Sequence, residues 1–438
     1  MTTHMPRRVA VFAAAGASTA LLLAGCAGGA ESTGSVDLSS DAPTGVTLTM
    51  WHSSADSQAL LDLYAAYEEA SGNTIDFVDL PNDTAPAAVQ TKWATGERPD
   101  ILQYNPSPQD MAQLNMSENM IDISALDYVA DSKLSNVAGT IDGVTYGVVL
   151  GPVSVYGLYY NKDVLAAAGL DTPPQNAADL LAACSAIQSS GSDASAVFMG
   201  GGSEWPSMML PGFAYMGDAN QGNAYGEAVA AGDVKVNDDG SPVETGLQMV
   251  VDLREAGCFN DDYSTATYEE SLKALLDGTT GMTVLPSDQI AELYAAADAA
   301  TVDATVGFTS FSAETGVPSY NAGPFGSYFA PKTGDAEKER AAVDFLDWIT
   351  TEGYQGYVDQ AQIVPTISTA DAGSLSGLYA EAAELLQRDD ATIGFNASIP
   401  GFGNFGGIAV KVLVGQSTPS QGVDDWQVFI DQAIAAQQ

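Results

Sequence analysis

The sequence predicts an α/β protein of two lobes, each built on a mainly parallel sheet flanked by helices. Two observations predict this fold class. The first is length, because the 413 residues that follow residue 25 exceed what one hydrophobic core ordinarily holds. The second is a regular alternation of short β-rich segments with helical patterns, which is typical of parallel sheets covered by helices.

The alternation is clearest in the first hundred residues. Residues 46–51 (VTLTMW) alternate like a strand, and a helix with apolar residues at helical spacing follows and ends at Gly72. A second strand is predicted over 74–78, a helix over 85–95 and a third strand over 99–102. This strand–helix–strand order indicates the start of an α/β lobe.

The same reasoning predicts the later elements. Residues 144–160 are rich in Val, Tyr and Gly, and they indicate strand segments separated by turns. The other predictions are strands at 195–199, 281–285 and 304–310, and helices at 161–169, 176–190, from 205, 243–256, 266–277, 287–299, 335–350, 374–387, 403–415 and 423–436.

The N-terminus has the pattern of a secretory signal. Arg7 and Arg8 precede an apolar stretch over 9–24, which is shorter than the roughly 20 residues that span a bilayer. The stretch ends in Leu23-Ala24-Gly25-Cys26, which resembles the bacterial lipobox. In a lipobox the cysteine thiol receives a diacylglycerol and the chain is cut before it.

We therefore expect a signal peptide over 1–25 and a lipidated Cys26 that begins a flexible tether over 26–45, which is small and polar. The protein would then lie on the extracellular face of the cell membrane, held by its lipid anchor only. A secreted protein needs such an anchor where no outer membrane retains it, which favours a Gram-positive cell. The alternative is an ordinary signal peptide with a chance cysteine.

The charge is strongly negative. Two of the 14 Lys and Arg lie before residue 26, so 12 remain against 56 Asp and Glu, a net charge of −44 with His neutral. Such a surface repels nucleic acid and anionic lipid, so no nucleic-acid partner is expected. It also disfavours an anionic ligand unless a local cationic pocket exists. We expect a soluble, monomeric protein on its tether.

Two cysteines remain after Cys26. Cys184 and Cys258 form an even pair in an oxidising compartment, which favours one disulfide, although two separate buried thiols are the alternative. No Cys/His cluster occurs, so neither a metal site nor a cofactor is expected.

Several segments resemble motifs of one family in the family's own order. Residues 158–165 (LYYNKDVL) followed by 168–170 (AGL) are the most specific, and 94–101 (ATGERPDI) and 142–148 (DGVTYGV) precede them. These segments, with looser matches at 278–285 and 364–366, resemble family 1 extracellular solute-binding proteins. That maltose-binding type serves carbohydrate ABC importers.

The resemblance implies a two-lobe clamshell of the periplasmic-binding-protein type. By analogy, the N-terminal lobe is 46–153 plus 312–364, and the C-terminal lobe is 154–311 plus 365–438. A sugar, expected to be an oligosaccharide, would bind in the cleft between the lobes. The closed receptor would then deliver it to the transmembrane subunits of an ABC permease.

Candidate ligand-binding residues are aromatic or polar side chains just past strand ends, since sugars offer C–H faces to rings and hydroxyls to polar groups. For Trp51 and Phe402 the alternative is packing, for His52 a surface role, and for Asp288 an ordinary exposed acid. The candidates are Trp51, His52, Tyr104, Asn105, Tyr156, Tyr159, Trp205, Asp288, Asn321, Phe325 and Phe402.

The sequence offers little to an enzyme. His52 is the only histidine after residue 25, and no Gly-x-Ser-x-Gly elbow occurs, so no catalytic residue is predicted. A secreted glycoside hydrolase with two catalytic carboxylates is one alternative, because 56 acids leave it open. A binding protein for a solute other than a sugar is the other.

Overall fold

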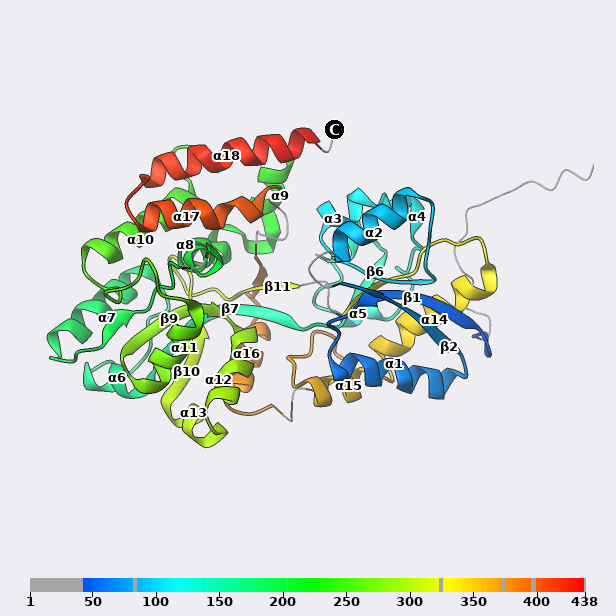
Figure 1. Cartoon of the computed structure of the whole chain (residues 1–438), viewed down its shortest axis with the longest axis horizontal. Coiled ribbons are helices and arrows are strands. Elements are labelled where there is room, and N and C mark those ends of the chain that lie inside the picture. The colour runs from blue at the N-terminus through cyan, green and yellow to red at the C-terminus, as the bar shows by residue number, and fades with distance from the viewer. Residues whose placement is uncertain are drawn as a thin grey trace, which may run out of the picture. The chain divides into compact units, whose positions relative to one another are not determined.

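The computed structural model describes residues 42–436, apart from 82–84, 137, 203, 323–325, 372, 374 and 395–398. The signal peptide, Cys26 and nearly all of the predicted tether lie outside the described residues. Figure 1 shows two sheets, each surrounded by helices. We call each sheet with its covering helices a lobe.

The first sheet has five strands in the order β2-β1-β3-β12-β6. β1 pairs in parallel with β2 and β3, whereas β12 runs antiparallel to both β3 and β6. One strand is therefore reversed. The strands are β1 (Thr47–Ser53), β2 (Thr74–Leu80), β3 (Ile101–Gln103), β6 (Gly147–Val149) and β12 (Ser327–Phe329), with a separate ribbon of β4 (Thr140–Ile141) and β5 (Val144–Thr145).

The second sheet has six strands, with β13-β11-β7-β9-β8 in order and β10 also paired with β7. β7 runs antiparallel to β9, β10 and β11, and it is the reversed strand here. The strands are β7 (Val153–Asn161), β8 (Ser195–Val197), β9 (Thr280–Pro286), β10 (Val306–Ser310), β11 (Ser319–Ala322) and β13 (Thr392–Ile393).

The reversed strands follow from how the chain passes between the sheets. β6 leads directly into β7, and β11 leads into β12. A chain that leaves one sheet at its carboxyl edge enters the next sheet at that sheet's carboxyl edge, so the entering strand runs backwards. The two crossings therefore join the carboxyl edges of both sheets, and these edges are where α/β sheets place ligands.

Helices cover both faces of the first sheet. Leu48 and Met50 of β1 pack under one helical layer, while Trp51, which follows Met50, packs under the other, as the period of two requires. The first layer is α1 (Gln58–Ser71), α14 (Ala336–Thr350) and α15 (Tyr354–Ala361). The second is α2 (Ala85–Ala94), α3 (Pro108–Gln113) and α4 (Met116–Asn119). The short α5 (Tyr128–Asp131) comes next in the chain, and its Tyr128 packs in the core of the first layer.

The second sheet is likewise covered on both faces. One face packs against α11 (Tyr268–Asp277), α12 (Ile290–Ala296), α13 (Ala299–Thr305) and α16 (Gly377–Leu386). The helices that share the other core are α6 (Lys162–Ala167), α7 (Ala177–Ser189), α8 (Glu204–Ala219), α9 (Ala224–Ala231), α10 (Pro242–Glu255), α17 (Phe405–Leu413) and α18 (Pro419–Ala436).

The crossing segments are tied together beside α15. The Tyr354 hydroxyl donates to Leu150 O (2.9 Å) and accepts from Thr366 N (3.0 Å), so it joins the first crossing to the segment after α15. Leu150 N donates to Gly326 O (2.7 Å) in the second crossing. Gly326 has φ +72°, and an added Cβ there would collide with the Gly151 carbonyl oxygen, so this contact requires glycine.

The structure confirms the α/β class and most of the predicted elements, with informative differences. The single helix predicted over 287–299 is divided, because Ala297 is extended and Asp298 caps a new helix, α13. β11 was not predicted. It pairs with β7 of the second sheet, although 312–364 was assigned to the first lobe. The lobe boundaries otherwise stay a prediction.

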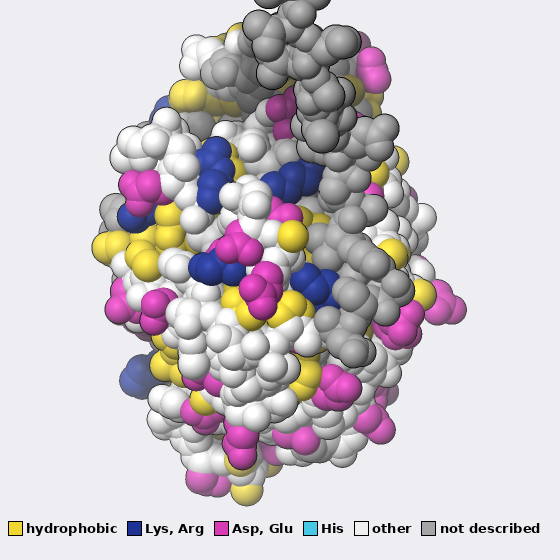
Figure 2. Space-filling view, turned by 90° about the vertical axis from the view of Figure 1, so that its right-hand side faces the viewer, with side chains coloured by type: hydrophobic (Ala, Val, Ile, Leu, Met, Phe, Trp, Pro, Cys, Tyr) yellow, Lys and Arg dark blue, Asp and Glu magenta, His cyan; other side chains and the backbone are white. Residues whose placement is uncertain are grey.

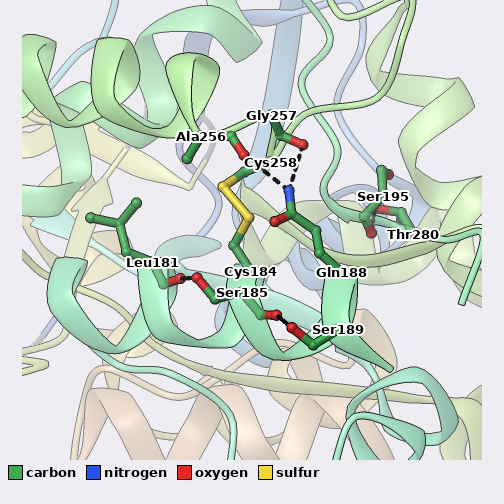
Figure 3. Close-up of a disulfide and its surroundings, with 10 residues drawn as sticks. All are labelled: Leu181, Cys184, Ser185, Gln188, Ser189, Ser195, Ala256, Gly257, Cys258 and Thr280. Atoms are coloured by element: carbon green, nitrogen blue, oxygen red, sulfur yellow. Dashed lines mark hydrogen bonds between the residues drawn. A yellow bond between two sulfur atoms is a disulfide. The ribbon is translucent and has the colours of Figure 1, made fainter. Parts of the chain in front are cut away.

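The second lobe contains a disulfide. Cys184 of α7 and Cys258, just past α10, are bonded, with their Cα atoms 5.7 Å apart (Figure 3). The Gln188 amide donates to Ala256 O and Gly257 O, each at 3.0 Å, and so fixes the loop that carries Cys258 against α7. Val197 N donates to Cys258 O (2.9 Å), which connects the bridge to β8.

Removing the bridge should destabilise the protein. It closes a 74-residue separation, so replacing both cysteines with serine should lower the free energy of unfolding by about 2–5 kcal/mol. Urea unfolding measures the difference. A reductant should destabilise the wild-type protein by a similar amount and leave the double serine variant unchanged. Equal stability of oxidised and reduced wild type would contradict the bridge.

Candidate ligand-binding site

The two carboxyl edges gather most of the predicted ligand residues. At the first edge, His52 is the penultimate residue of β1, and Tyr104 and Asn105 directly follow β3. At the second edge, Trp205 is the second residue of α8, the helix that comes after β8, and Asp288 comes after β9. Asn321 lies near the end of β11 (Figure 1). Strand order thus brings together residues far apart in sequence.

Asp56 organises the first edge. Its carboxylate accepts hydrogen bonds from His52 Nδ1 (3.0 Å), the Tyr64 hydroxyl (2.7 Å) and Gln103 Nε2 (2.8 Å). The Tyr64 hydroxyl also lies 2.6 Å from that of Tyr328 in β12. A carboxylate that is 1% exposed needs such partners. The network therefore locks the ends of β1, β3 and β12 to α1.

His52 lies between two carboxylates. Its ring is 5% exposed; Nδ1 meets Asp56, and Nε2 lies 2.9 Å from Asp79 Oδ1, as an ion pair whose angle is too poor for a hydrogen bond. Burial works to lower the pKa of His52, but the hydrogen bond to Asp56 and the charges of Asp56 and Asp79 outweigh it and raise the pKa above 6.5. The two carboxylates thus favour the protonated ring, and both ring nitrogens face groups of the protein itself in this conformation.

The aromatic candidates of the first edge belong to the lobe's own core. Trp51 is 3% exposed, and Lys92 Nζ lies over its ring at 5.1 Å from the centroid. Tyr104 is 3% exposed, and its hydroxyl accepts from Gln90 Nε2 at 3.3 Å. Asn105 is half-buried and directly follows. Trp51, His52 and Tyr104 are buried in this conformation, so among the predicted residues of this edge it is Asn105 that has side-chain surface available to a ligand.

A tight glycine turn positions Trp205 at the second edge. Gly201 N donates to Tyr263 O (2.7 Å) and Gly202 N to Ala266 O (2.9 Å), and a Cβ at Gly202 would collide with Thr265 O. Trp205 is half-buried in the first turn of α8. Its ring lies 4.9 Å from that of Tyr268, inclined at 56°. The two rings form a partly exposed aromatic pair of the kind on which sugar C–H faces stack.

Oxygen acceptors accompany this aromatic pair. Asp288 keeps an exposed side chain, yet the surrounding protein removes enough water to raise its pKa. Gln289 Oε1 and Asn321 Oδ1 are buried and have no hydrogen-bond donor among the described residues. Gln289 belongs to η3 (Ser287–Gln289), whose Ser287 Oγ accepts from Val155 N (2.9 Å), and Asn321 pairs with Ser154. The two amides therefore flank the start of β7.

The remaining candidates pack into the protein. Tyr159 is fully buried; its hydroxyl donates to Pro286 O (3.0 Å) and its ring lies 4.6 Å from Phe308, so no surface is left for a ligand in this conformation. Tyr156 is 5% exposed in the core beneath α7 and α8. Phe402 is half-buried at η5 (Phe402–Asn404), beside Trp426. Phe325 lies outside the described residues.

Two important residues escaped sequence reasoning. Tyr268 completes the aromatic pair but lies 63 positions after Trp205, and no local pattern links them. Asp56 was one acid among 56. Its partners His52, Tyr64 and Gln103 lie on a strand, a helix and another strand, so no local sequence pattern marks it.

Two grooves lie beside the crossing segments and away from these residues. One, of about 470 Å³, is lined by the start of α1, Pro152 and the end of α15. The other, of about 520 Å³, is lined mainly by residues 365–371 with Asp131 and Lys133. Neither contains a predicted ligand residue. Their chemistry is less suited to a sugar than the aromatic pair, because neither offers two rings.

No described helix is long and apolar enough to cross a membrane. Nor does the described part of the chain hold a group of three His, Cys, Asp or Glu arranged to bind a metal ion.

The architecture defines a class of protein. Two α/β lobes joined by crossings at their carboxyl edges are the fold of solute receptors that bind a ligand between lobes. The chain matches the family model described as bacterial extracellular solute-binding protein over residues 62–386. It therefore belongs to that family, and the predicted family resemblance is confirmed. No curated protein matches significantly in sequence.

Solved structures share the whole fold. A chitin oligosaccharide binding protein is 21% identical, with a TM-score of 0.69 over 89% of this chain and 99% of that one. RafE from Streptococcus pneumoniae is 18% identical, with a TM-score of 0.71 over 90% and 100%. GacH of Streptomyces glaucescens, solved with acarbose, is 17% identical, with a TM-score of 0.63 over 90% and 99%. These matches confirm the predicted two-lobe fold.

The His52 ion pairs predict a pH-dependent stability. Because its pKa is raised in the folded protein, the stabilisation is fully present below the unfolded value of about 6.5 and is lost as pH rises through the folded pKa. Replacing His52 with Gln should lower the free energy of unfolding at pH values below the unfolded pKa of about 6.5. Above that pH, it should make the free energy of unfolding less dependent on pH. Urea unfolding across this pH range measures both, and His4 is the chain's other histidine. Identical pH profiles for the two proteins would refute the ion-pair account.

Proposed function

We propose that this protein is the sugar-binding component of an ABC importer. It would capture an oligosaccharide between the carboxyl edges of its two sheets and deliver it to the permease's transmembrane subunits. The observation that carries the proposal is the Trp205–Tyr268 pair at the second edge, in a chain of the solute-binding family. Rings with exposed faces beside hydrogen-bond acceptors suit a sugar better than an ion or a peptide.

The two carboxyl edges would contribute different groups to ligand binding. The first edge is tied by Asp56 and offers Asn105 and the exposed Asp79, while the second offers the aromatic pair, Asp288 and Asn321. A ligand that contacts both edges would favour the conformation that brings them together. It shifts that equilibrium only as far as its affinity for that conformation exceeds its affinity for the other.

The proposal includes attachment through Cys26. A diacylglycerol on this residue, followed by the tether, would hold the receptor on the extracellular face of the membrane near its permease. Dual acyl chains bind a bilayer firmly, since each buried methylene contributes about 0.8 kcal/mol. Mass spectrometry of the membrane fraction tests this directly, because an unmodified or uncleaved N-terminus would contradict it.

The protein is proposed to bind its sugar without cleaving it. A panel of oligosaccharides examined by calorimetry, with product analysis after long incubation, tests both parts. Saturable binding with unchanged sugars is the expected result. Release of shorter sugars would instead identify a glycoside hydrolase, and the absence of any sugar binding would overturn the proposal.

Replacing Trp205 with Ala should weaken sugar binding by about 1–3 kcal/mol, from the apolar area that a large ring buries. Calorimetry with a panel sugar that binds measures the change. Trp205→Phe keeps a ring and should retain most of the affinity. Phe429→Ala removes an exposed ring of α18 and serves as the matched control with unchanged affinity. Full affinity in Trp205→Ala would exclude the aromatic pair from the site.

A further inference from the structure

The aromatic pair continues into a row of acids. The Tyr268 hydroxyl donates to Glu292 Oε1 at 3.3 Å, and Glu292 lies four residues after Asp288 in the continuous turn from η3 to α12. A spacing of four places both carboxylates on one side of that turn. We call Trp205, Tyr268, Glu292 and Asp288 the aromatic–acidic strip. It presents two ring faces and two carboxylates within one part of the second edge.

The strip carries uncompensated negative charge. Among the described residues, no Lys or Arg forms an ion pair with Asp288 or Glu292. Burial together with the nearby Glu292 and Glu269 carboxylates raises the pKa of Tyr268. Both Glu292 and Glu269 are exposed, so a ligand can reach them. The surroundings therefore favour a positive charge brought by the ligand.

Unpaired acceptors at the same edge of the sheet point the same way. Gln289, next to Asp288, has a buried Oε1 without a donor among the described residues, and Asn321 Oδ1 is in the same state. A buried acceptor without a donor destabilises the folded protein. A ligand rich in N–H and O–H donors would relieve this, whereas a carboxylate, sulfate or phosphate would add acceptors to an edge that already has too many.

The chain's cations are divided between the two lobes, and Lys273 of α11, in the same lobe as the strip, pairs with Asp277. Several cations of the first lobe lie away from the strip. Figure 2, which views the molecule from the right-hand side of Figure 1, shows Lys and Arg side chains grouped on that face. Arg98 precedes β3, Lys338 pairs with Asp100 at 2.8 Å, and Lys332 follows the reversed β12. All three therefore lie toward the amino edge of the first sheet. They are remote in the topology from the carboxyl edges.

We propose that the bound saccharide carries a positively charged amino group, held over the Trp205 and Tyr268 rings and beside the Asp288 and Glu292 carboxylates. This inference rests on the proposed sugar-binding function and names the class of sugar. An ammonium is attracted to a ring face and forms charge-assisted hydrogen bonds with carboxylates, so both halves of the strip contribute. An acetamide or hydroxyl group in the same place carries no charge. It would therefore gain neither the full attraction to the ring face nor the full strength of a charge-assisted hydrogen bond.

Three disaccharides with one backbone separate charge from shape. Cellobiose, N,N′-diacetylchitobiose and the deacetylated chitobiose share the β-1,4 linkage and differ at carbon 2, as hydroxyl, acetamide and ammonium. Calorimetry of the full-length protein should give an affinity about three- to tenfold higher for the ammonium form, and added salt should reduce this preference. An ammonium form that binds equally, more weakly or not at all overturns the inference.

Isosteric variants assign the preference to the strip. Combining Asp288→Asn with Glu292→Gln should bring the affinity ratio of the ammonium form to the acetylated form close to one. Glu255→Gln, an exposed acid at the end of α10, should leave the ratio unchanged. A ratio that persists in the double variant overturns the assignment to these carboxylates.

The double variant should remain folded. The pKa of Asp288 is raised in the folded protein, so its charged form opposes folding at neutral pH, and asparagine removes that charge. An unfolding transition no lower than that of the wild type confirms a fair comparison. The preference should also decline as the pH is lowered through the raised pKa of Asp288, because the neutral carboxyl attracts an ammonium less.

The outcome is separable from that of the proposed function. Panel sugars that bind normally while the ammonium form shows no advantage would refute this inference and leave the sugar receptor intact. A panel in which no sugar binds would refute the proposed function.

Discussion

The constraint on which the structure depends is the way the chain passes between its two sheets. β6 continues into β7, and β11 into β12, so each sheet receives one strand that runs against the others. Because both passages leave and enter at carboxyl edges, those edges are adjacent along the chain wherever the sheets themselves lie. The Tyr354 hydroxyl and the contact between Gly151 and Gly326 hold the passages together at the first lobe.

The two carboxyl edges differ in how far their polar groups are paired within the protein. At the first edge, Asp56 and its donors use nearly all of the polar groups that could have bound a ligand, and His52 and Gln103 become structural. At the second edge, the amide oxygens of Gln289 and Asn321 have no donor among the described residues, and partial desolvation raises the pKa of Asp288. Unsatisfied groups lower stability, and sites where function outweighs stability are where they are expected. Under the proposed function, this contrast favours the second lobe as the source of ligand choice.

Much of the fold was predictable because its elements are long and strongly patterned. The α/β alternation of residues 46–102 needed only the difference between periods of two and 3.6. Cys184 and Cys258 could be paired by counting cysteines, and the structure joins them. β13 and β11 escaped prediction because strands of two and four residues carry too little periodicity. β11 depends on a partner in β7 that is more than 150 residues away, and β13 depends in turn on β11.

The candidate site was selected from sequence by position along the chain, and the structure shows which of the selected side chains share one edge of a sheet. The rule that ligands bind beyond strand ends selected Trp205, Asp288 and Asn321, which do meet at one edge. The same rule selected Trp51 and Tyr159, whose rings are buried, because it does not say which face of the sheet a side chain occupies. Tyr268 could not be found, since its relation to Trp205 exists only after α8 and α11 pack around β9.

Hydrogen–deuterium exchange with and without a bound oligosaccharide tests the central claim most directly, because it reports protection along the whole chain. If a sugar binds between the carboxyl edges, exchange should slow at residues 198–206, 286–292 and 319–322 of the second lobe and around 103–105 of the first. Protection confined to the amino edges, or to the two grooves beside the crossing segments, would contradict the account.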